Sequence, residues 1–461
     1  MKLNRYFGDQ AFYKRLFSVA IPIIIQNGIT NFVSLLDNIM IGQVGTVQMN
    51  GVSIANQLLF VFNLAIFGAE AGAGIFTAQY YGRGDHAAVR STFRFKVLIC
   101  TLLTAVGAGV FLLFGRELIQ LYLMGEGNPA DAAASLQHGL DYIGVMLVGL
   151  LPFAMSNAYS GTLRETGNGT VPMIAGIVAV LVNLGLNYVL IFGNFGAPAM
   201  GAVGAAWATV VSRYVELAIV AVWTHTNSGK VPFIRRAYRS VRIPGKLLRS
   251  MLVRGTPLVF SEMLWAVGVA LQSQCFTMRG LDVVAATNIA NTVNNLASVA
   301  FLALGNAVGI LMGQMMGAGH TSQQLREANT KMLVASVLTS SIFGVVLAGV
   351  ATVFPLLYNT TQEIRYLATQ MVLVLALVKP FVGYCNAAYF TLRAGGRTDI
   401  TFVYDCLYMW CLTVPLAFCL SRFTNIPIVP LYLIVQGTEM LKCVVGYVMI
   451  RSGIWIQNLT Q

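Results

Sequence analysis

The sequence predicts an all-α membrane protein whose twelve transmembrane helices form two six-helix lobes. Three observations lead to this fold class: the composition, the number of long apolar runs, and an internal repeat. The 461 residues are 57% hydrophobic and only 10% charged, and their mean hydropathy is +0.71. A water-soluble domain has no core large enough to bury so much apolar surface. A lipid bilayer is therefore the expected solvent.

The apolar runs give the number of helices, because a spanning helix needs roughly 20 mostly apolar residues. Loops of Gly, Pro, Asn and charged residues separate the runs. The predicted spans are 15–41, 50–80, 91–115, 136–161, 170–194, 201–225, 250–279, 285–316, 328–355, 364–392, 399–421 and 427–451. Since their number is even, both termini are expected on the same side of the membrane.

The distribution of positive charge indicates which side that is. Most of the 29 Lys and Arg residues lie in the amino terminus, in the central linker and in alternate loops, which carry Arg83, Arg90, Arg94, Lys96, Arg164, Arg326, Lys331, Arg393 and Arg397. The other loops carry only Arg116, Arg279, Arg365 and Arg422. Basic loops are cytoplasmic by the positive-inside rule, so we expect a multi-pass protein of the plasma membrane with both termini in the cytoplasm. Topology and anionic lipid headgroups account for the net charge of +12, and no nucleic-acid partner is needed.

An internal repeat divides the chain into two homologous halves. An offset of 235 residues pairs Pro22 with Pro257 and holds without a gap through most of three spans. The other matches include Gly45/Gly280, Gln79/Gln314, Gly82/Gly317, Gly84/Gly319 and Lys96/Lys331 at this offset, and Asn157/Asn386 and Arg164/Arg393 at an offset of 229. We therefore predict an amino-terminal lobe at 1–225, a cytoplasmic linker at 226–249 and a carboxy-terminal lobe at 250–461.

The symmetry of the repeat suggests a mechanism. Six is an even number, so each half begins on the cytoplasmic side, and the halves are parallel repeats related by an axis along the membrane normal. Two similar bundles can rock about a central cavity and open it to each side in turn, which is the usual basis of alternating access. A monomer is sufficient for this mechanism.

Several separate motifs resemble the multidrug and toxic compound extrusion (MATE) family. They are "LLDNIMIGQVG" in the first span, "GAGIFTAQYYGRGD" at the end of the second, "TLRETGNGT" before the fifth, "NLGLNYVLIFG", and "GAVGAAWATVVSR". The resemblance runs from about residue 15 to 450. It implies a secondary antiporter that exports small organic cations and drugs in exchange for sodium ions or protons.

Asp37 is the first candidate site residue. A charge in the middle of the bilayer costs about 2.5–3.5 kcal/mol even on the lenient insertion scale, so such carboxylates are functional candidates. The resemblance groups Asp37 with Asn183, Asn187 and Thr209 as the proton-coupling or ion-coupling site, where Na⁺ is the possible metal. One carboxylate with amide and hydroxyl oxygens could hold sodium or bind a proton, and the sequence does not decide between them. A buried acid with a purely structural role is the alternative.

A second group of candidates concerns the substrate or a polar site of the carboxy-terminal lobe. The resemblance implies a functional glutamate in the seventh span, which is Glu262; its repeat partner is Asn27. Lys379 in the tenth span needs a partner, and we expect Glu262 to provide it. Trp265 is on the same helix face as Glu262 and could offer its ring to a cationic substrate, and Glu70 could extend the polar lining of the cavity.

Other function classes have less support. The His and Cys residues lack metal-ligand or Cys-x-x-Cys spacing, and no cluster of catalytic groups is apparent, so we predict neither an enzyme nor a cofactor beyond the coupling ion. A lipid-linked oligosaccharide flippase of the same superfamily remains the alternative, but it should line its cavity with several Arg or Lys. The expected mechanism is competition: the incoming ion neutralises Asp37, and the cationic drug then leaves outward.

Overall fold

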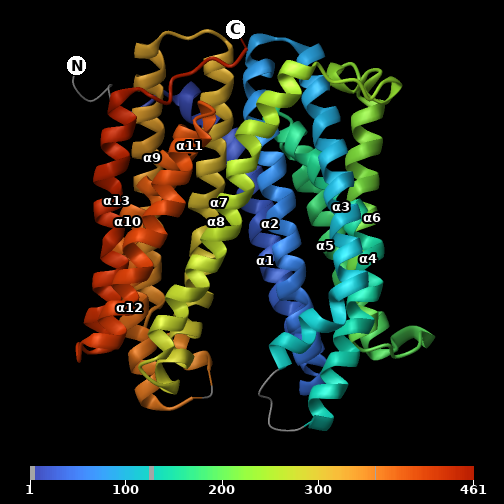
Figure 1. Ribbon diagram of the computed structural model, residues 1–461, viewed down its shortest axis with the longest axis vertical. Helices are drawn as coiled ribbons and strands as arrows, with labels where there is room; N and C mark the ends of the chain where they lie inside the picture. The colour runs from blue at the N-terminus through green and yellow to red at the C-terminus, as the bar shows by residue number, and fades with distance from the viewer. Residues whose placement is uncertain (1–5, 124–128, 359, 461) are drawn as a thin grey trace. The chain divides into compact units, whose positions relative to one another are not determined.

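A computed structural model describes residues 6–123, 129–358 and 360–460, and all regular secondary structure in these ranges is helical (Figure 1). The first half contains α1 (Gln10–Gly42), α2 (Thr46–Arg83), α3 (His86–Leu123), α4 (Pro129–Glu165), α5 (Thr170–Phe192) and α6 (Ala202–Thr226). The second half contains α7 (Gly245–Thr277), α8 (Leu281–Gly317), α9 (Ser322–Val350), α10 (Gln362–Ala394), α11 (Thr398–Phe402), α12 (Val414–Phe423) and α13 (Ile428–Ser452).

The α11 and α12 helices are two ends of one membrane span. Two π-helical segments, Val403–Leu407 and Met409–Thr413, connect them, so the helix continues from Thr398 to Phe423. Within the described ranges, eleven helices are long and apolar enough to cross a membrane. The α1 helix of 33 residues is the twelfth long helix, since it exceeds the roughly 20 residues that a span requires. The predicted all-helical membrane fold is confirmed.

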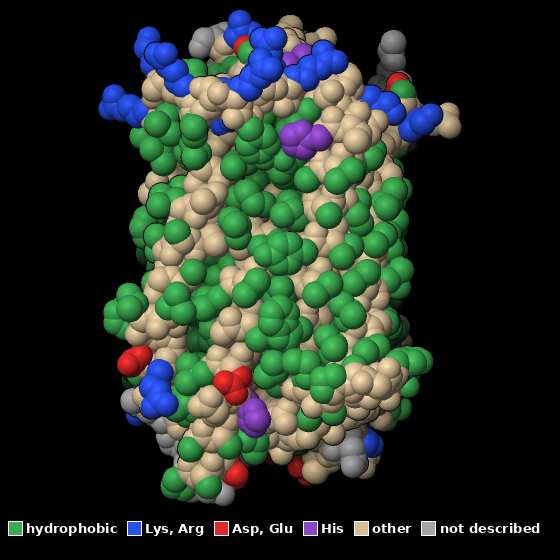
Figure 2. Space-filling model, turned by 90° about the vertical axis from the view of Figure 1, so that its right-hand side faces the viewer, with side chains coloured by type: hydrophobic (Ala, Val, Ile, Leu, Met, Phe, Trp, Pro, Cys, Tyr) green, Lys and Arg blue, Asp and Glu red, His purple; other side chains and the backbone are tan. Residues whose placement is uncertain are grey.

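The outer surface matches a bilayer. Figure 2 shows one face on which hydrophobic side chains form a broad band, with Lys and Arg gathered at one end of it. Large apolar side chains such as Leu112, Leu113 and Val345 are more than 70% exposed. In water such exposure would be unfavourable, whereas in lipid it costs nothing. The chain is therefore a multi-pass membrane protein.

The packing divides the chain into two compact units that are discontinuous in sequence. We call Ile25–Thr77 with Asp85–Val259 the N-unit, and Met1–Ile24 with Ala78–Gly84 and Phe260–Gln461 the C-unit. The break points Ile24 and Val259 are separated by 259 minus 24, which is 235, the repeat offset. The C-unit therefore contains the first segment of α1, up to Ile24, and the N-unit contains the first segment of α7, up to Val259. The lobe boundaries at residues 225 and 250 remain a prediction.

Small residues allow these segments to pack closely. In the N-unit, a Cβ on Gly72 of α2 would overlap the backbone of Gly255 in α7. In the C-unit, Ala20 of α1 and Ala307 of α8 are fully buried in one core cluster. These alanines are the repeat equivalents of the two glycines, because 255 minus 235 is 20 and 72 plus 235 is 307. Close helix contacts through small residues are typical of membrane proteins.

A reciprocal contact in the C-unit shows the same symmetry. A Cβ on Gly82 of α2 would overlap the carbonyl oxygen of Gln314 in α8, and a Cβ on Gly317 would overlap that of Gln79. Gly82 and Gly317 are repeat partners, as are Gln79 and Gln314. The Gln79 side chain is fully buried and donates to the Ala394 carbonyl oxygen at 3.0 Å. Glycine at both positions is therefore a requirement of this helix crossing.

Replacing Gly317 with alanine is expected to destabilise the C-unit by about 1–3 kcal/mol, because the new methyl group must displace the backbone of Gln79. The loss is measured as a lower midpoint of thermal unfolding in detergent. Gly437→Ala is the control, since no atom lies within 4 Å of its Cβ position; its stability should stay the same or rise, because alanine favours helix. Equal midpoints for the Gly317 variant and the wild type would contradict this packing.

The C-unit places α10 between α8, α9 and α13. In the N-unit, α6 packs on both α4 and α5, and α3 packs on α4. Proline interrupts the hydrogen-bond ladder inside α1 at Pro22, α4 at Pro152, α7 at Pro257 and α10 at Pro380. These helices carry most of the candidate site residues.

Candidate functional site

Asp37 of α1 lies at the centre of a polar cluster in the N-unit. Asn187 Nδ2 donates to Asp37 Oδ1 at 2.6 Å and to Asn183 Oδ1 at 3.1 Å. Asn183 Nδ2 donates to Thr209 Oγ1 at 3.3 Å. The structure thus brings together the four residues that the sequence grouped as a coupling site.

Local structure explains this grouping. Asn183 and Asn187 are one turn apart on α5, so they share a face, and both are buried. Thr209 comes from α6, which packs along α5. Asp37 is only partly buried. A partly exposed carboxylate beside buried amides can exchange a proton or an ion.

Tyr142 of α4 is a further member of the polar cluster around Asp37, and the sequence did not reveal it. Its side chain is buried, and its hydroxyl donates to Asn56 Oδ1 at 3.3 Å and is hydrogen-bonded to Thr209. Tyr142 stands in an apolar run, where tyrosine is usually a packing residue. The one indication of its role is the buried hydroxyl, because a buried hydroxyl needs a hydrogen-bond partner.

The Asn183 amide lies beside Asp37 and admits two assignments of its nitrogen and oxygen. The amide atom that faces Asp37 lies 3.1 and 3.2 Å from the two carboxylate oxygens. If this atom is Nδ2, it donates to the carboxylate, and Oδ1 accepts from the Thr209 backbone N–H and hydroxyl, both at 3.3 Å. If it is Oδ1, oxygens face one another and need a proton or cation between them. The Nδ2 orientation satisfies the Asp37 carboxylate and the Thr209 donors together, so Asn183 helps to hold ionised Asp37.

The donor set also fits a small hard cation. Carboxylate, amide and hydroxyl oxygens of Asp37, Asn183 and Thr209 are the ligand type that such cations prefer. Asn187 Oδ1 is buried and has no hydrogen-bond partner within the described chain. An unused buried oxygen beside a carboxylate is available as a ligand for sodium.

Glu262 of α7 and Lys379 of α10 do not form the expected pair. Glu262 Oε1 accepts from the Tyr389 hydroxyl at 3.3 Å and lies 3.9 Å from Arg393 Nη1. Lys379 Nζ instead donates to oxygens of α8. The reason is depth in the membrane, because Arg393 follows Lys379 by 14 residues, which is about 21 Å of helix. The sequence assigned Arg393 to a basic loop and so missed it as the partner.

The other candidates are divided between the units. Trp265, in the C-unit, is 40% exposed, and Asn27, in the N-unit, is partly buried in α1. Glu70 is 9% exposed inside the N-unit, where Cys100 Sγ donates to its Oε1 at 3.2 Å. Glu70 therefore belongs to a buried cluster of charged groups with Lys96 of α3. It is less exposed than the polar lining of a cavity would be. The roles of Trp265 and Asn27 stay predictions.

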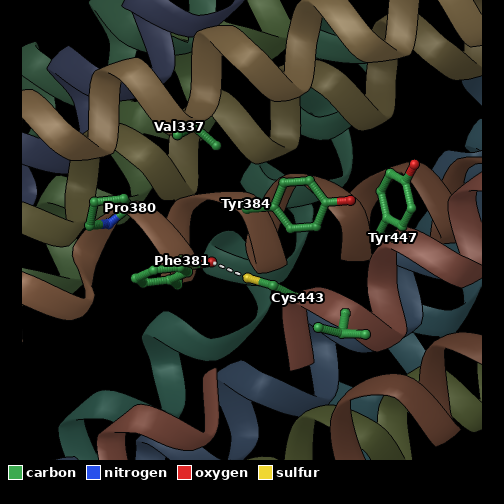
Figure 3. Close-up of a pocket in the computed structure, with 7 residues that line it drawn as sticks. Val337, Pro380, Phe381, Tyr384, Cys443 and Tyr447 are labelled. Carbon is green, nitrogen blue, oxygen red and sulfur yellow. Dashed lines mark hydrogen bonds between the residues drawn. The ribbon is translucent and has the colours of Figure 1, made fainter. Parts of the chain in front are cut away.

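A pocket of about 400 Å³ lies in the C-unit between α9, α10 and α13 (Figure 3). Its lining is Val337, Pro380, Phe381, Tyr384, Cys443, Val444 and Tyr447. Cys443 Sγ donates to the Phe381 carbonyl oxygen at 3.4 Å. The lining contains no charged side chain, so this pocket offers no site for an ion.

Comparison with known proteins agrees with this architecture. The MatE family model matches residues 22–189 and 257–419, which begin at the two repeat prolines. The chain is 23% identical to the probable multidrug resistance protein NorM of Thermotoga maritima, over 96% of this chain and 93% of that protein. It is 25% identical to the multidrug resistance protein MdtK of Edwardsiella ictaluri, over 90% and 88%.

A solved structure shares the fold. The bent form of the Vibrio cholerae MATE transporter VcmN superposes with a TM-score of 0.83 at 19% identity, over 96% of this chain and 97% of that one. The family match covers both repeats and well over half of the residues. The chain therefore belongs to the MatE family, and it is a membrane transporter of the MATE type, not an enzyme.

Proposed function

We propose that this chain is a secondary antiporter that exports organic cations and drugs in exchange for protons or sodium ions. The observation that carries the proposal is Asp37, a carboxylate within a membrane-spanning helix whose hydrogen-bond donor is the neutral Asn187 amide. Carboxylates in such positions are characteristic of ion pathways. The names of the NorM and MdtK relatives, multidrug resistance proteins, support drugs as the substrate class.

The exchange works by competition for one negative charge. Ionised Asp37 accepts from Asn187 and attracts a cationic substrate. Two opposite unit charges 4 Å apart interact by about 4 kcal/mol at an effective dielectric constant of 20. Binding of a proton or Na⁺ cancels most of this attraction, so the substrate leaves.

The rest of the proposal follows from the sequence. The basic loops favour the plasma membrane with cytoplasmic termini, and the parallel repeat favours rocking of two lobes in a monomer. Lipid-linked anions are less suitable substrates, because the buried Lys379 is occupied by Asn294 and Ser298. The coupling ion is H⁺ or Na⁺, since the Asp37 cluster suits both.

Export of a fluorescent aromatic cation from bacteria tests this function. Cells that express the chain should accumulate less dye than cells with an empty vector. Collapse of the gradient that drives export, whether of protons or of sodium ions, should remove this difference, whereas collapse of the other gradient should not. The gradient that matters identifies the ion. Equal accumulation in both cell lines, with the protein present in the membrane, would reject export of this substrate class. Export that survives collapse of both gradients would reject the antiport mechanism.

A further inference from the structure

Lys379 is an unusual residue because its ammonium group is deeply buried in a membrane-spanning bundle. The residue is 2% exposed. Its Nζ donates to Asn294 Oδ1 at 2.6 Å and to Ser298 Oγ at 3.0 Å, and it lies 4.8 Å from the centre of the Phe301 ring. All three partners come from α8, and all three are neutral.

No described carboxylate forms an ion pair with this ammonium. The only charged residue of α8 is Asp282, which precedes Asn294 by 12 residues, or about 18 Å. The last charged residue of α9 is Lys331. It precedes Gly344, the α9 residue that packs against Lys379, by 13 residues.

The remaining neighbouring acids serve other cations. Glu262 of α7 lies beside Arg393, near the far end of α10. On α13, the charge of Glu439 acts on Lys442, which pairs with Asp405 at 2.6 Å. The positive charge of Lys379 is therefore balanced only by dipoles and a ring.

The three partners form a site of recognisable chemistry. Residues 294, 298 and 301 recur at helical spacing, so they lie along one face of α8. An amide oxygen, a hydroxyl oxygen and an aromatic face are groups that bind an alkylammonium ion. The Ser298 hydroxyl donates its proton to the backbone carbonyl oxygen of Asn294 at 2.7 Å, so the lone pairs of Ser298 Oγ remain available to a cation.

We propose that this face of α8 is a cation-binding cage and that the Lys379 ammonium fills it as a tethered cation. The C-unit then carries its positive charge throughout the transport cycle. A second cation is repelled from the cage, so neither the exchange ion nor a cationic substrate binds there. If the proposed antiport is correct, and this consequence rests on it, the exchange ion does not couple at this face of α8.

Chemical rescue tests the cage directly. Lys379→Ala removes a fragment equivalent to n-propylammonium, and the purified variant should have a lower midpoint of thermal unfolding. Added n-propylammonium should raise that midpoint by about 2 °C, while the neutral 1-propanol should not, and the wild type should respond to neither. Lys331→Ala is the matched control, since this α9 lysine is not held by the cage. Identical responses of Lys379→Ala to the amine and the alcohol would overturn the proposal.

Two further variants decide the question if Lys379→Ala does not fold. Lys379→Arg keeps a cation and should unfold near the wild-type midpoint, whereas Lys379→Gln keeps a donor without charge and should unfold lower. A Gln variant as stable as the wild type would show that the cage needs only a hydrogen bond, and would overturn the proposal. These readouts do not require transport, so absent export would reject the proposed function and leave the cage unaffected.

Discussion

Replacing Asp37 with asparagine is expected to reduce gradient-driven export of an aromatic cation by about a hundredfold or more, because a neutral amide can neither attract the substrate nor be neutralised by the incoming ion. The variant keeps nearly the same side-chain size and the neighbours Asn183 and Asn187. Its fold should therefore be retained. The measurement is the initial rate of dye efflux at matched protein levels, with the proton and sodium gradients collapsed in turn.

Asp141→Asn provides the control for this experiment. Asp141 belongs to α4 of the same unit, where it accepts from Gln137 Nε2 at 2.8 Å on an exposed part of the helix. Loss of its charge should leave efflux unchanged. If Asp37→Asn exports as fast as the wild type and with the same dependence on the gradients, then Asp37 is structural, and the coupling must lie elsewhere, with Glu262 as the next residue to change.

Much of the fold follows from the sequence because hydrophobic length and repetition are local properties. The offset between Pro22 and Pro257 also equals the offset between the packing boundaries Ile24 and Val259. The exchange of first-helix segments between the units was not predictable, because it depends on which small residues meet in space. Gly72 and Gly255 carry no sequence signal of their contact.

The candidate site shows where sequence reasoning stops. Asn183 and Asn187 could be placed on one face because helical spacing is regular, and the family resemblance linked them to Asp37. Partners on different helices depend on depth in the membrane, which the sequence does not give. This is why Lys379 was expected to pair with Glu262, whereas Arg393 is the cation near that carboxylate.

Lys96 shows a similar error. The sequence assigned it to the cytoplasmic basic residues that set topology. In the structure it is fully buried in α3, and its Nζ lies 2.6 Å from Glu165 Oε2 at the end of α4. Gly161 and Gly74 make room for this pair. A Cβ on Gly161 would lie 3.4 Å from Lys96 Nζ, and one on Gly74 would overlap Glu165 Oε1.

Loss of Lys96 is therefore expected to cost about 3–5 kcal/mol of stability, because Glu165 loses the buried ammonium that lies 2.6 Å from its carboxylate. Lys96→Met keeps an unbranched side chain as long as the lysine stem and removes the ammonium group with its charge and hydrogen bonds. Beside it, Glu70 is also buried and would lose a nearby positive charge. The measurement is thermal or denaturant unfolding of the purified protein in detergent.

An exposed ion pair in the same chain supplies the comparison. Arg397 Nη2 lies 2.9 Å from Asp399 Oδ2, but the two side chains are 34% and 65% exposed. Arg397→Gln should cost less than about 1 kcal/mol, because water replaces the lost partner. The double variant Lys96→Met, Glu165→Gln should be more stable than Lys96→Met alone, since it also removes the carboxylate that lost its ammonium partner. If Lys96→Met has the same unfolding midpoint as the wild type, the buried ion pair does not hold α3 to α4.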